Sequence, residues 1–536
     1  MDALAPWLLP LPDAEAMRAI DGWAIEQRGV PGVELMERAG AGVARALERL
    51  APDGRVAVLC GKGNNGGDGL VAARLLREAG REAIVVCTAA PWDLQGDARA
   101  NLERLPGEPP RRLDGERWAR GQDAPRCTPA SLHETFGPLA AVIDAVLGTG
   151  FVGEPRDAAA SAVAAINATD APVLSVDVPS GVDASSGAVA GAAVRAAVTV
   201  TFHAAKPGLW IRPGKAHAGE VQTIDIGIPR GAPAHARVGL ITDAALALLA
   251  RREASSTKFV SGHVLVAGGS LGLTGAPRMA AEASMRAGAG YVTACVPASL
   301  QPVLAGAGLP EMMTRALPER DGALSPDALG AVLDAGGRGG ALALGPGLGR
   351  SDGAFAFARA LAREAPVAMV LDADGLNAHA GRLAELAGRG APTVLTPHAG
   401  ELARLLELDS EQIETQRLRH ARAAAEQAQA VTVLKGDDTL VACPDGTVAV
   451  SPGASPALAT AGTGDVLTGV IAALLAQGLD AFAAAAAGVH LHARAGREAA
   501  RRLGACEGVI ASDVIAALPA VRSVRQPEHT EEGSRG

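Results

Sequence analysis

Two consecutive series of short apolar runs, separated by helix-length segments, constrain the fold of this 536-residue chain more than any other feature. The runs are continuous and rich in Val, Ile and Leu, which is typical of strands buried on both faces of a parallel sheet. They are VAVLC (56–60), AIVVC (83–87), AAVIDAV (140–146), PVLSVDV (172–178) and AVTVTFH (197–203), then GHVLVAGG (262–269), GYVTACV (290–296), ALALGPG (341–347), VAMVLDADG (367–375), APTVLTP (391–397) and AVTVLKG (430–436). The predicted fold class is α/β, with helices covering both faces of each sheet.

The segment 228–239 lies between the two series and is rich in Pro, Gly and Ala, as linkers are. All five Trp residues precede it. We therefore predict an N-terminal domain over 1–230 and a C-terminal domain over 237–522, followed by a polar, disordered tail at 523–536. Within the first domain, the pattern predicts a helix from about 12 to 50, broken at 29–32, and a surface loop at 105–127.

Composition excludes several classes of protein. The formal net charge is −9 and aromatic residues make up 2% of the chain, which argues against a nucleic-acid-binding protein. The six cysteines are scattered without a C-x-x-C pair, so we expect neither a disulfide framework nor a zinc site. The N-terminus lacks a signal-peptide pattern, and the apolar stretch 466–479 is shorter than the ~20 residues that span a bilayer. We expect a soluble, cytoplasmic protein that binds no membrane.

A glycine-rich segment, GKGNNGGDGL (61–70), follows the run 56–60 and precedes a helical pattern. Glycines at a strand-to-helix turn let backbone amides approach an anionic or sugar-phosphate ligand. A simple tight turn would explain one or two glycines, but not the polar Asn64, Asn65 and Asp68 between them. The spacing is not G-x-G-x-x-G, so it does not predict a standard dinucleotide site.

Two carboxylates stand at the ends of predicted strands, where ligands of open α/β sheets bind. Asp144 precedes the glycine loop LGTGFVGE (147–154), and Asp177 precedes Ser180 in SVDVPSGVD (175–183). A lone Asp at such a place is commonly a turn or N-cap residue. Three polar loops on successive strands favour a ligand site instead. Asn65, Asp144 and Ser180 offer hard oxygen ligands, which suit an alkali or alkaline-earth cation rather than zinc.

In the second series, the segment ATAGTGDVLTGVIAALLAQG (459–478) predicts a buried helix that begins at Asp465 and ends near Gly478. The Gly462-Thr463-Gly464 run would then present free amides at a helix N-terminus, where a transferring phosphoryl group can bind. Asp465 would be placed to take a proton from an attacking hydroxyl. The alternative is that Asp465 only caps the helix.

Three motifs of the first domain, GNNGGDG, DAVLGTGFVG and VDVPSGVDASSG, resemble in order and spacing those of the NAD(P)H-hydrate epimerase family, over about 12–230. The resemblance implies a Rossmann-like three-layer domain that interconverts the R and S epimers of hydrated nicotinamide cofactors (NADHX and NADPHX) at C6. It places Asn65, Asp144 and Ser180 around a potassium ion. Asp177 would stabilise a cationic intermediate or shuttle the proton. The residues implied to contact the hydrate are Asn64, Asn65, Gly66, Gly67, Asp68, Gly148, Thr149, Gly150, Phe151, Val152, Gly153, Glu154 and Asp177.

The second domain resembles the ribokinase-like ADP/ATP-dependent NAD(P)H-hydrate dehydratases over about 237–520. The segments that carry this resemblance are 268–292, 345–349 (GPGLG), 372–377 (DADGLN), 395–405 (LTPHAGELARL), 433–446 (VLKGDDTLVACPDG) and 459–478. The resemblance implies that Ala276, Gly349, His398 and Asp465 contact the S-hydrate, and that Lys435, Gly436, Asp437, Asp438, Thr439 and Gly464 line the adenine nucleotide. From spacing alone, His398 could equally be a hydrogen-bonded histidine at a loop end. The sequence departs from the family at Ala461, where the family usually has the first of two glycines.

Together the two resemblances imply a homo-oligomeric, bifunctional enzyme. The first domain would epimerise the hydrates, and the second would dehydrate the S-epimer with ADP and Mg²⁺, giving NAD(P)H, AMP and phosphate. The alternative is a ribokinase-like kinase of a vitamin precursor, fused to a non-catalytic binding module.

Overall fold

The computed structural model describes residues 4–120, 132–233, 236–336 and 340–522. The chain divides into two compact units: the first consists mainly of Pro10–Gly239, and the second of Ala5–Leu9, Leu240–Ile413 and the chain from Leu418 onward. The predicted tail at 523–536 and part of the predicted loop at 105–127 lie outside the described residues. The described part of that loop contains no helix or strand beyond a bridge between Arg111 and its neighbours.

The first unit contains a six-stranded parallel sheet in the order β3-β2-β4-β5-β6-β7. The strands are β2 (Val56–Cys60), β3 (Ala83–Cys87), β4 (Ala141–Ala145), β5 (Val173–Val176), β6 (Val198–Phe202) and β7 (Glu220–Ile224). The strand order reverses direction between β2 and β4, and ligands of such sheets bind at the carboxyl ends beside this reversal. The edge strand β7 was not predicted, because its side chains are all partly or fully exposed and form no apolar run.

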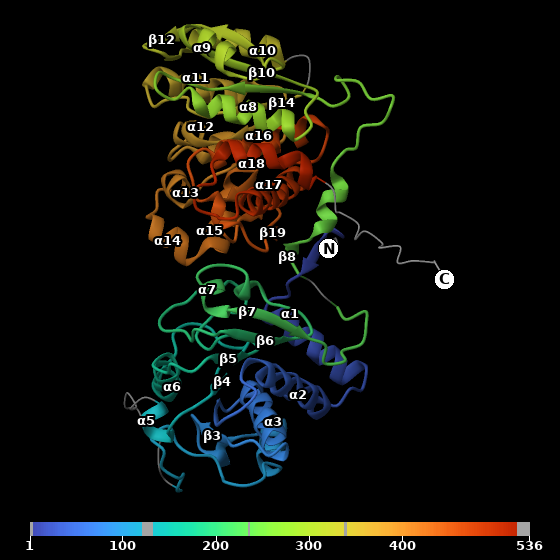
Figure 1. The fold of residues 1–536 in the computed structure, drawn as a ribbon, viewed down its shortest axis with the longest axis vertical. Helices are drawn as coiled ribbons and strands as arrows, with labels where there is room; N and C mark the ends of the chain where they lie inside the picture. Colours follow the sequence, from blue (N-terminus) through green and yellow to red (C-terminus); the bar gives the residue numbers. More distant parts are fainter. Residues whose placement is uncertain (1–3, 121–131, 234–235, 337–339, 523–536) are drawn as a thin grey trace, which may run out of the picture. The chain divides into compact units, whose positions relative to one another are not determined.

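Helices cover both faces of this sheet, so the predicted three-layer α/β architecture is confirmed. Figure 1 shows α2 and α3 on one side of the strands and α6 on the other. The helices are α1 (Ala14–Gly22), a π-helical turn η1 (Trp23–Gln27), α2 (Gly32–Leu50), α3 (Asn64–Glu78), α4 (Gly96–Glu103), α5 (Leu132–Phe136), α6 (Asp157–Asn167) and α7 (Lys215–Ala218), with 3₁₀ turns at Pro91–Asp93 and Pro207–Leu209. The break predicted at 29–32 separates η1 from α2.

The second unit contains an eleven-stranded sheet in the order β1-β8-β19-β18-β17-β16-β15-β14-β9-β10-β11, parallel from β17 to β11. Its parallel strands are β9 (His263–Ala267), β10 (Tyr291–Pro297), β11 (Met313–Leu317), β14 (Ala341–Leu344), β15 (Ala368–Leu371), β16 (Thr393–Leu395) and β17 (Val431–Leu434). Antiparallel β18 (Leu440–Ala442) and β19 (Val448–Val450) follow. A separate hairpin joins β12 (Glu319–Arg320) to β13 (Ala323–Leu324).

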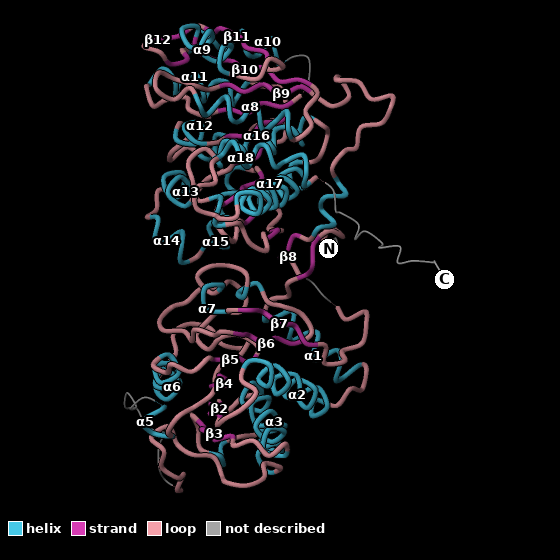
Figure 2. Tube along the Cα trace, in the orientation of Figure 1, coloured by secondary structure: helices cyan, strands magenta, loops and turns pink. Residues whose placement is uncertain are grey.

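Helices of the second unit lie beside these strands, as Figure 2 shows. They are α8 (Gly275–Arg286), α9 (Gln301–Ala307), α10 (Leu329–Gly336), α11 (Asp352–Glu364), α12 (Ala373–Asn377), α13 (Ala399–Leu406), α14 (Ser410–Thr415), α15 (Arg417–Ala428), α16 (Thr463–Ala476), α17 (Ala481–Leu503) and α18 (Ala511–Ala517). The apolar α16 is buried against α8 at Gly469, where a Cβ atom would lie 2.1 Å from the Ala280 carbonyl oxygen. Within the described ranges, no helix is long and apolar enough to cross a membrane.

The N-terminal strand β1 (Leu8–Pro10) belongs to the second sheet, where it lies beside β8 (Val238–Ile241). Trp7 is buried just before β1, and its ring packs against Phe482 at a centroid distance of 5.4 Å. Ala5–Leu9 therefore groups with the second unit, although the sequence places the whole N-terminus in the first domain.

Candidate active sites

The first candidate site lies at the carboxyl ends of β2, β4 and β5, beside the reversal of strand order. The glycine-rich segment 61–70 was predicted to precede the helix, but from Asn64 onward it forms the first turns of α3. Glycine is required there because a Cβ atom on Gly66 would lie 2.0 Å from the Gly61 carbonyl oxygen. A Cβ on Gly69 would likewise lie 2.6 Å from the Ala145 side chain. The two glycines let α3 start directly against the sheet, with its N-terminal amides at the site.

Asp177 follows β5 in the left-handed conformation (φ +67°) and is held on both carboxylate oxygens. Lys206 donates to Oδ1 at 2.6 Å, and Thr149 donates to Oδ2 through its backbone N–H (3.0 Å) and its hydroxyl. Burial would raise the pKa of Asp177, but the ammonium of Lys206 and the Thr149 donors outweigh it, so this pKa lies below its ordinary value. The structure thus brings the predicted loop 148–154 and Asp177 together.

Lys206, whose side chain is only 1% exposed, was not predicted from the sequence as a site residue. Its ammonium also donates to Thr201 at 2.7 Å and to the Phe202 carbonyl at 3.2 Å. A buried lysine needs such partners. The available signal was its place after the carboxyl end of the run 197–203, where Lys206 is the first cation.

Two more carboxylates face this ion pair. Asp68, on α3, is buried, and the charges of Asp177 and Asp21 act on it. Burial first, then these charges, raise the pKa of Asp68 well above its ordinary value. Asp21, near the end of α1, was not singled out by any motif, and burial is the main cause that raises its pKa to about 6.

The three residues predicted to hold a cation lie in one neighbourhood, because Ser180 contacts both Asp144 and Leu147, and Asn65 lies against the adjoining Gly148. Asp144 is fully buried and accepts hydrogen bonds from the Ser180 hydroxyl (2.6 Å), the Ser180 N–H (2.9 Å) and the Ser175 hydroxyl (2.9 Å). Burial raises the pKa of Asp144 despite these donors. Asn65 lies against Gly148, and its buried amide oxygen and nitrogen have no hydrogen-bond partner within the described part of the chain. An unpartnered amide oxygen near a buried carboxylate that lacks a basic partner suits a cation with oxygen ligands.

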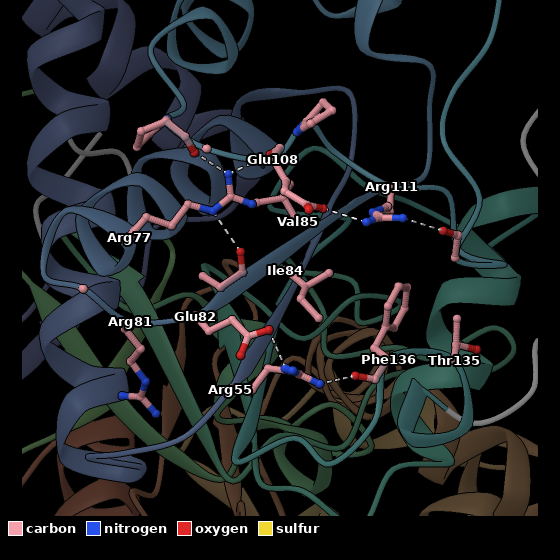
Figure 3. Close-up of a pocket in the computed structure, with 16 residues that line it drawn as sticks. Arg55, Arg77, Arg81, Glu82, Ile84, Val85, Glu108, Arg111, Thr135 and Phe136 are labelled. Atoms are coloured by element: carbon pink, nitrogen blue, oxygen red, sulfur yellow. Dashed lines mark hydrogen bonds and ion pairs between the residues drawn. The ribbon is translucent and has the colours of Figure 1, made fainter.

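A hollow of about 760 Å³ lies elsewhere in the first unit (Figure 3), toward the amino ends of β2 and β3. Four arginines line it, but their guanidinium groups are engaged: Arg77 donates to the Ala83 carbonyl at 2.9 Å, Arg81 to the Asp53 carbonyl at 2.8 Å, and Arg55 pairs with Glu82 at 2.7 Å. None of the predicted site residues borders it. Its position opposite the carboxyl ends of the strands separates it from the candidate site.

The second candidate site is built around Asp465, on the first turn of α16. Three acidic groups surround a single ammonium: Lys435 lies 3.0 Å from Asp372 Oδ1 and 3.6 Å from Glu401 Oε2, and its charge also acts on Asp465. Burial would lower the pKa of Lys435, but Asp372 and Glu401 outweigh it and raise that pKa. Thr468, one turn along α16, donates to Asp372 at 2.7 Å. Asp372, Glu401 and Thr468 lie within the motif segments 372–377, 395–405 and 459–478, but the sequence did not predict a role for them.

Asp465 has a pKa raised to about 7, first by burial and then by the charge of Asp372. Such a carboxyl group can exchange a proton near neutral pH. The helix begins two residues earlier than predicted, at Thr463, because Gly462 (φ +89°) serves as the N-cap. The amides of residues 462–464 therefore open directly onto Asp465 and Lys435, whose amine lies 3.6 Å from the position of a Cβ on Gly464.

His398 caps α13, so it is a hydrogen-bonded histidine at a loop end, and its predicted contact with the hydrate stays a prediction. Its Nδ1 accepts hydrogen bonds from the N–H groups of Gly400 (3.0 Å) and Glu401 (3.4 Å), and Glu401 completes a capping box. Burial lowers the pKa of His398, which favours the neutral ring. Its side chain is nevertheless 56% exposed, so Nε2 remains accessible on the side of Glu401 and Lys435.

The other predicted dehydratase residues lie in the loop after β14, at the start of α8 and in the loop after β17. Gly349 donates its N–H to Asp374 at 3.1 Å and lies beside Ser270, and Ala276 contacts the neighbouring Gly347. The nucleotide segment 435–439 follows β17 and is closed by a hydrogen bond from Thr439 to the Gly436 carbonyl at 2.6 Å.

Comparison with known proteins finds matches for both units of the chain. A family model described as NAD(P)H-hydrate dehydratase matches residues 264–520, and one described as YjeF-related protein N-terminus matches 32–208. Bifunctional NAD(P)H-hydrate repair enzymes from Moorella thermoacetica and Salinibacter ruber are each 42% identical to this chain, over 95% and 98% of it and 96% and 97% of their own lengths. An ADP/ATP-dependent NAD(P)H-hydrate dehydratase from Bacillus subtilis, co-crystallised with ATP/Mg²⁺, is 30% identical and covers 53% of this chain and 96% of its own, with a TM-score of 0.45. The chain belongs to the family of bifunctional NAD(P)H-hydrate repair enzymes.

Proposed function

We propose that this protein restores hydrated nicotinamide cofactors in two steps. The first unit interconverts (R)- and (S)-NAD(P)HX, and the second dehydrates the S-epimer at the expense of ADP, giving NAD(P)H, AMP and phosphate. The observation that carries this proposal is Asp465, with its raised pKa, beside the amides of residues 462–464 and the ammonium of Lys435. Membership of the repair-enzyme family supports it.

The second unit must remove a hydroxyl group that leaves poorly. Asp465 takes the proton of the C6 hydroxyl as that oxygen attacks the terminal phosphoryl group of the nucleotide. The amides of residues 462–464 and Lys435 stabilise the charge on the transferring group. The ring nitrogen then expels phosphate, which leaves far more readily than hydroxide. Mg²⁺ neutralises phosphate charge when it is bound, and the carboxylates of Glu401 and Asp372 offer the oxygen ligands that it prefers.

In the first unit, Asp177 remains ionised because Lys206 and Thr149 hold it. A fixed carboxylate beside the nicotinamide ring stabilises the cation that forms when the C6–oxygen bond breaks. We assign a potassium ion to Asn65, Asp144 and Ser180, where it would fix the start of α3 against the loop 148–154 and so shape the substrate site. Asn64, Gly66, Gly67 and Asp68 would contact the hydrate from α3.

One experiment tests both activities. The full-length chain is incubated with mixed hydrate epimers and ADP, then ATP, each with and without potassium, and both NADH absorbance and the epimer ratio are followed. Recovery of NADH from both epimers is expected, with potassium affecting only the R-to-S conversion. A stable phosphorylated product without NADH would indicate a kinase instead. Assembly into homo-oligomers and a cytoplasmic location remain predictions.

A further inference from the structure

The carboxylate of Asp177 is too fully engaged to carry a proton. Oδ1 accepts hydrogen bonds from Lys206 (2.6 Å) and Thr201 (3.3 Å), and Oδ2 accepts two from Thr149. Protonating it would break the ion pair with a lysine that is itself 1% exposed. Epimerisation at C6 nevertheless needs a group that gives a proton to the departing oxygen and takes one back. Another side chain near Asp177 must therefore carry that proton, if the first unit is the epimerase proposed above.

Helix α1 brings one candidate to the same end of the sheet. The Ala14 N–H donates to Ser185 Oγ at 3.0 Å, which ties the start of α1 to the loop that follows Asp177. Ile20 is buried in the same core cluster as Val200 and Phe202 of β6, the strand that precedes Lys206. Asp21 follows Ile20 in the chain and is half-buried, and the charges of Lys206 and Asp177 act on its carboxyl group.

Asp21 differs from Asp177 in its partners. No hydrogen bond within the described residues reaches its carboxyl group, so a proton can be gained or lost there without breaking one. The charged groups that act on it are Lys206 and Asp177, and Asp21 in turn acts on Asp68. Burial, the larger cause, and the charge of Asp177 together outweigh Lys206 and raise the pKa of Asp21 to about 6. When the pKa values of two acids at one site are shifted in opposite directions, one typically carries the proton while the other stays ionised.

We propose that Asp21 is the proton donor and acceptor of the epimerase, while Asp177 stays ionised and stabilises the cation. The ring-nitrogen lone pair forms the N1–C6 double bond as the C6–oxygen bond breaks. The Asp21 proton goes to the departing oxygen, which leaves as water. Water then adds to the opposite face of C6, the N1–C6 double bond returns to a single bond, and one proton returns to the Asp21 carboxylate. Atoms and charge balance, and no co-reactant is consumed.

The test compares Asp21→Asn with Glu15→Gln in the full-length chain. Glu15 is an exposed carboxylate on the same helix, so its substitution controls for the loss of a negative charge from α1. We expect Asp21→Asn to slow enzymatic R-to-S conversion by about 100-fold, with the KM for the hydrate changed by less than about threefold, and Glu15→Gln to match the unsubstituted chain. The kcat/KM of the unsubstituted chain should fall as pH rises through about 6, since the free enzyme must carry the proton. In Asp21→Asn, kcat/KM should no longer change with pH around 6. The rate of spontaneous R-to-S conversion is subtracted from every measurement.

The outcomes separate the two proposals. If the unsubstituted chain does not epimerise the hydrates, the proposed function fails. If it does and Asp21→Asn retains its rate and pH profile, the role of Asp21 is overturned. Asp21→Glu, which keeps an acid, should recover part of the rate. Equal loss in Asp21→Asn and Asp21→Glu would point to a structural role and would also overturn the proposal. Dehydration of (S)-NADHX by the same variants reports whether the second unit is intact.

Discussion

At the scale of single residues, the two aspartates central to the sites have opposite electrostatic surroundings. Asp177 is paired with a buried ammonium and keeps its charge, whereas Asp465 shares one ammonium with Asp372 and Glu401. One cation cannot neutralise three carboxylates, so the most weakly compensated of them takes up a proton most readily. In the proposed mechanism, the same residue type supplies a fixed charge in one unit and proton transfer in the other.

The pKa of Asp465 predicts how dehydration depends on pH. Because a proton acceptor must be ionised, kcat/KM for (S)-NADHX should rise with pH through about 7 and then level off. Asp465→Asn should lower kcat by about 10²- to 10⁴-fold without this titration, while R-to-S conversion continues. NADH formation from the purified S-epimer with ADP measures both effects. Full coenzyme recovery by Asp465→Asn would rule out its role as the base.

The Lys206–Asp177 pair makes a prediction about stability. Lys206→Met leaves a buried carboxylate without its cation, which costs about 3–5 kcal/mol. The free energy of unfolding of the first unit should fall accordingly, as measured by denaturant unfolding followed through its Trp fluorescence. Lys62→Met, at an exposed lysine of the same unit, is the control and should change little. Because the pKa of Asp177 is lowered by folding, its contribution is present above about pH 4, the ordinary range of an aspartate, and is lost as pH falls through its folded pKa.

At the scale of elements, the start of α16 shows why a departure from the family pattern is tolerated. Gly462 has φ +89°, and a Cβ atom there would lie 2.6 Å from the sulfur of Met279. Ala461 is exposed and is not among the described residues with positive φ. The helix N-cap therefore requires glycine at the second position of the pair but not at the first.

Two substitutions at adjacent positions check this. Gly462→Ala should raise the KM for ADP and lower kcat for dehydration by about tenfold or more, because the amides of residues 462–464 must shift by tenths of an ångström. Ala461→Gly should leave both constants within about twofold and cost at most about 1 kcal/mol of stability. Initial rates at varied ADP give both constants. Equal effects of the two substitutions would contradict this account.

Most elements could be predicted from the sequence, and the reasons for the exceptions are physical. Buried parallel strands such as β2 and β3 coincide with their apolar runs, because both faces of these strands are covered. Strands β18 and β19 are also buried but only three residues long, too short to form a pattern. In the candidate sites, sequence motifs contain Asp177 and Asp465, whereas Asp21 and Lys206 lie outside every motif. Asp21 and Lys206 come together only because α1 and β6 lie at the same end of a sheet. Spacing along the chain does not show this.

At the scale of the whole molecule, the sequence predicted two α/β domains but not that Leu8–Pro10 belongs to the second sheet. Strand β1 is three residues long and lies next to Pro10, so neither periodicity nor strand propensity marks it. Its place beside β8 depends on a partner far along the chain.

This arrangement predicts that damage near the N-terminus weakens the second unit. Trp7→Ala removes a ring that is 6% exposed and packed against Phe482, which should cost about 3–5 kcal/mol. Thermal unfolding should show a lower midpoint for the second unit, and dehydration should be lost at a lower temperature while epimerisation persists. Trp92→Ala, at a 41% exposed ring of the first unit, is the matched control. An unchanged second unit would show that β1 contributes nothing to it.

The pairing of β1 with β8 also has a consequence for biosynthesis. During synthesis β1 leaves the ribosome before β8, its neighbour about 230 residues later, and at 5–20 residues per second that delay is roughly 10 to 50 s. Throughout this interval Trp7 and Leu8 have no sheet to cover them, and they are open to chaperones and to other nascent chains. Slowing translation before β8 would prolong that exposure, and aggregation during synthesis should increase with it.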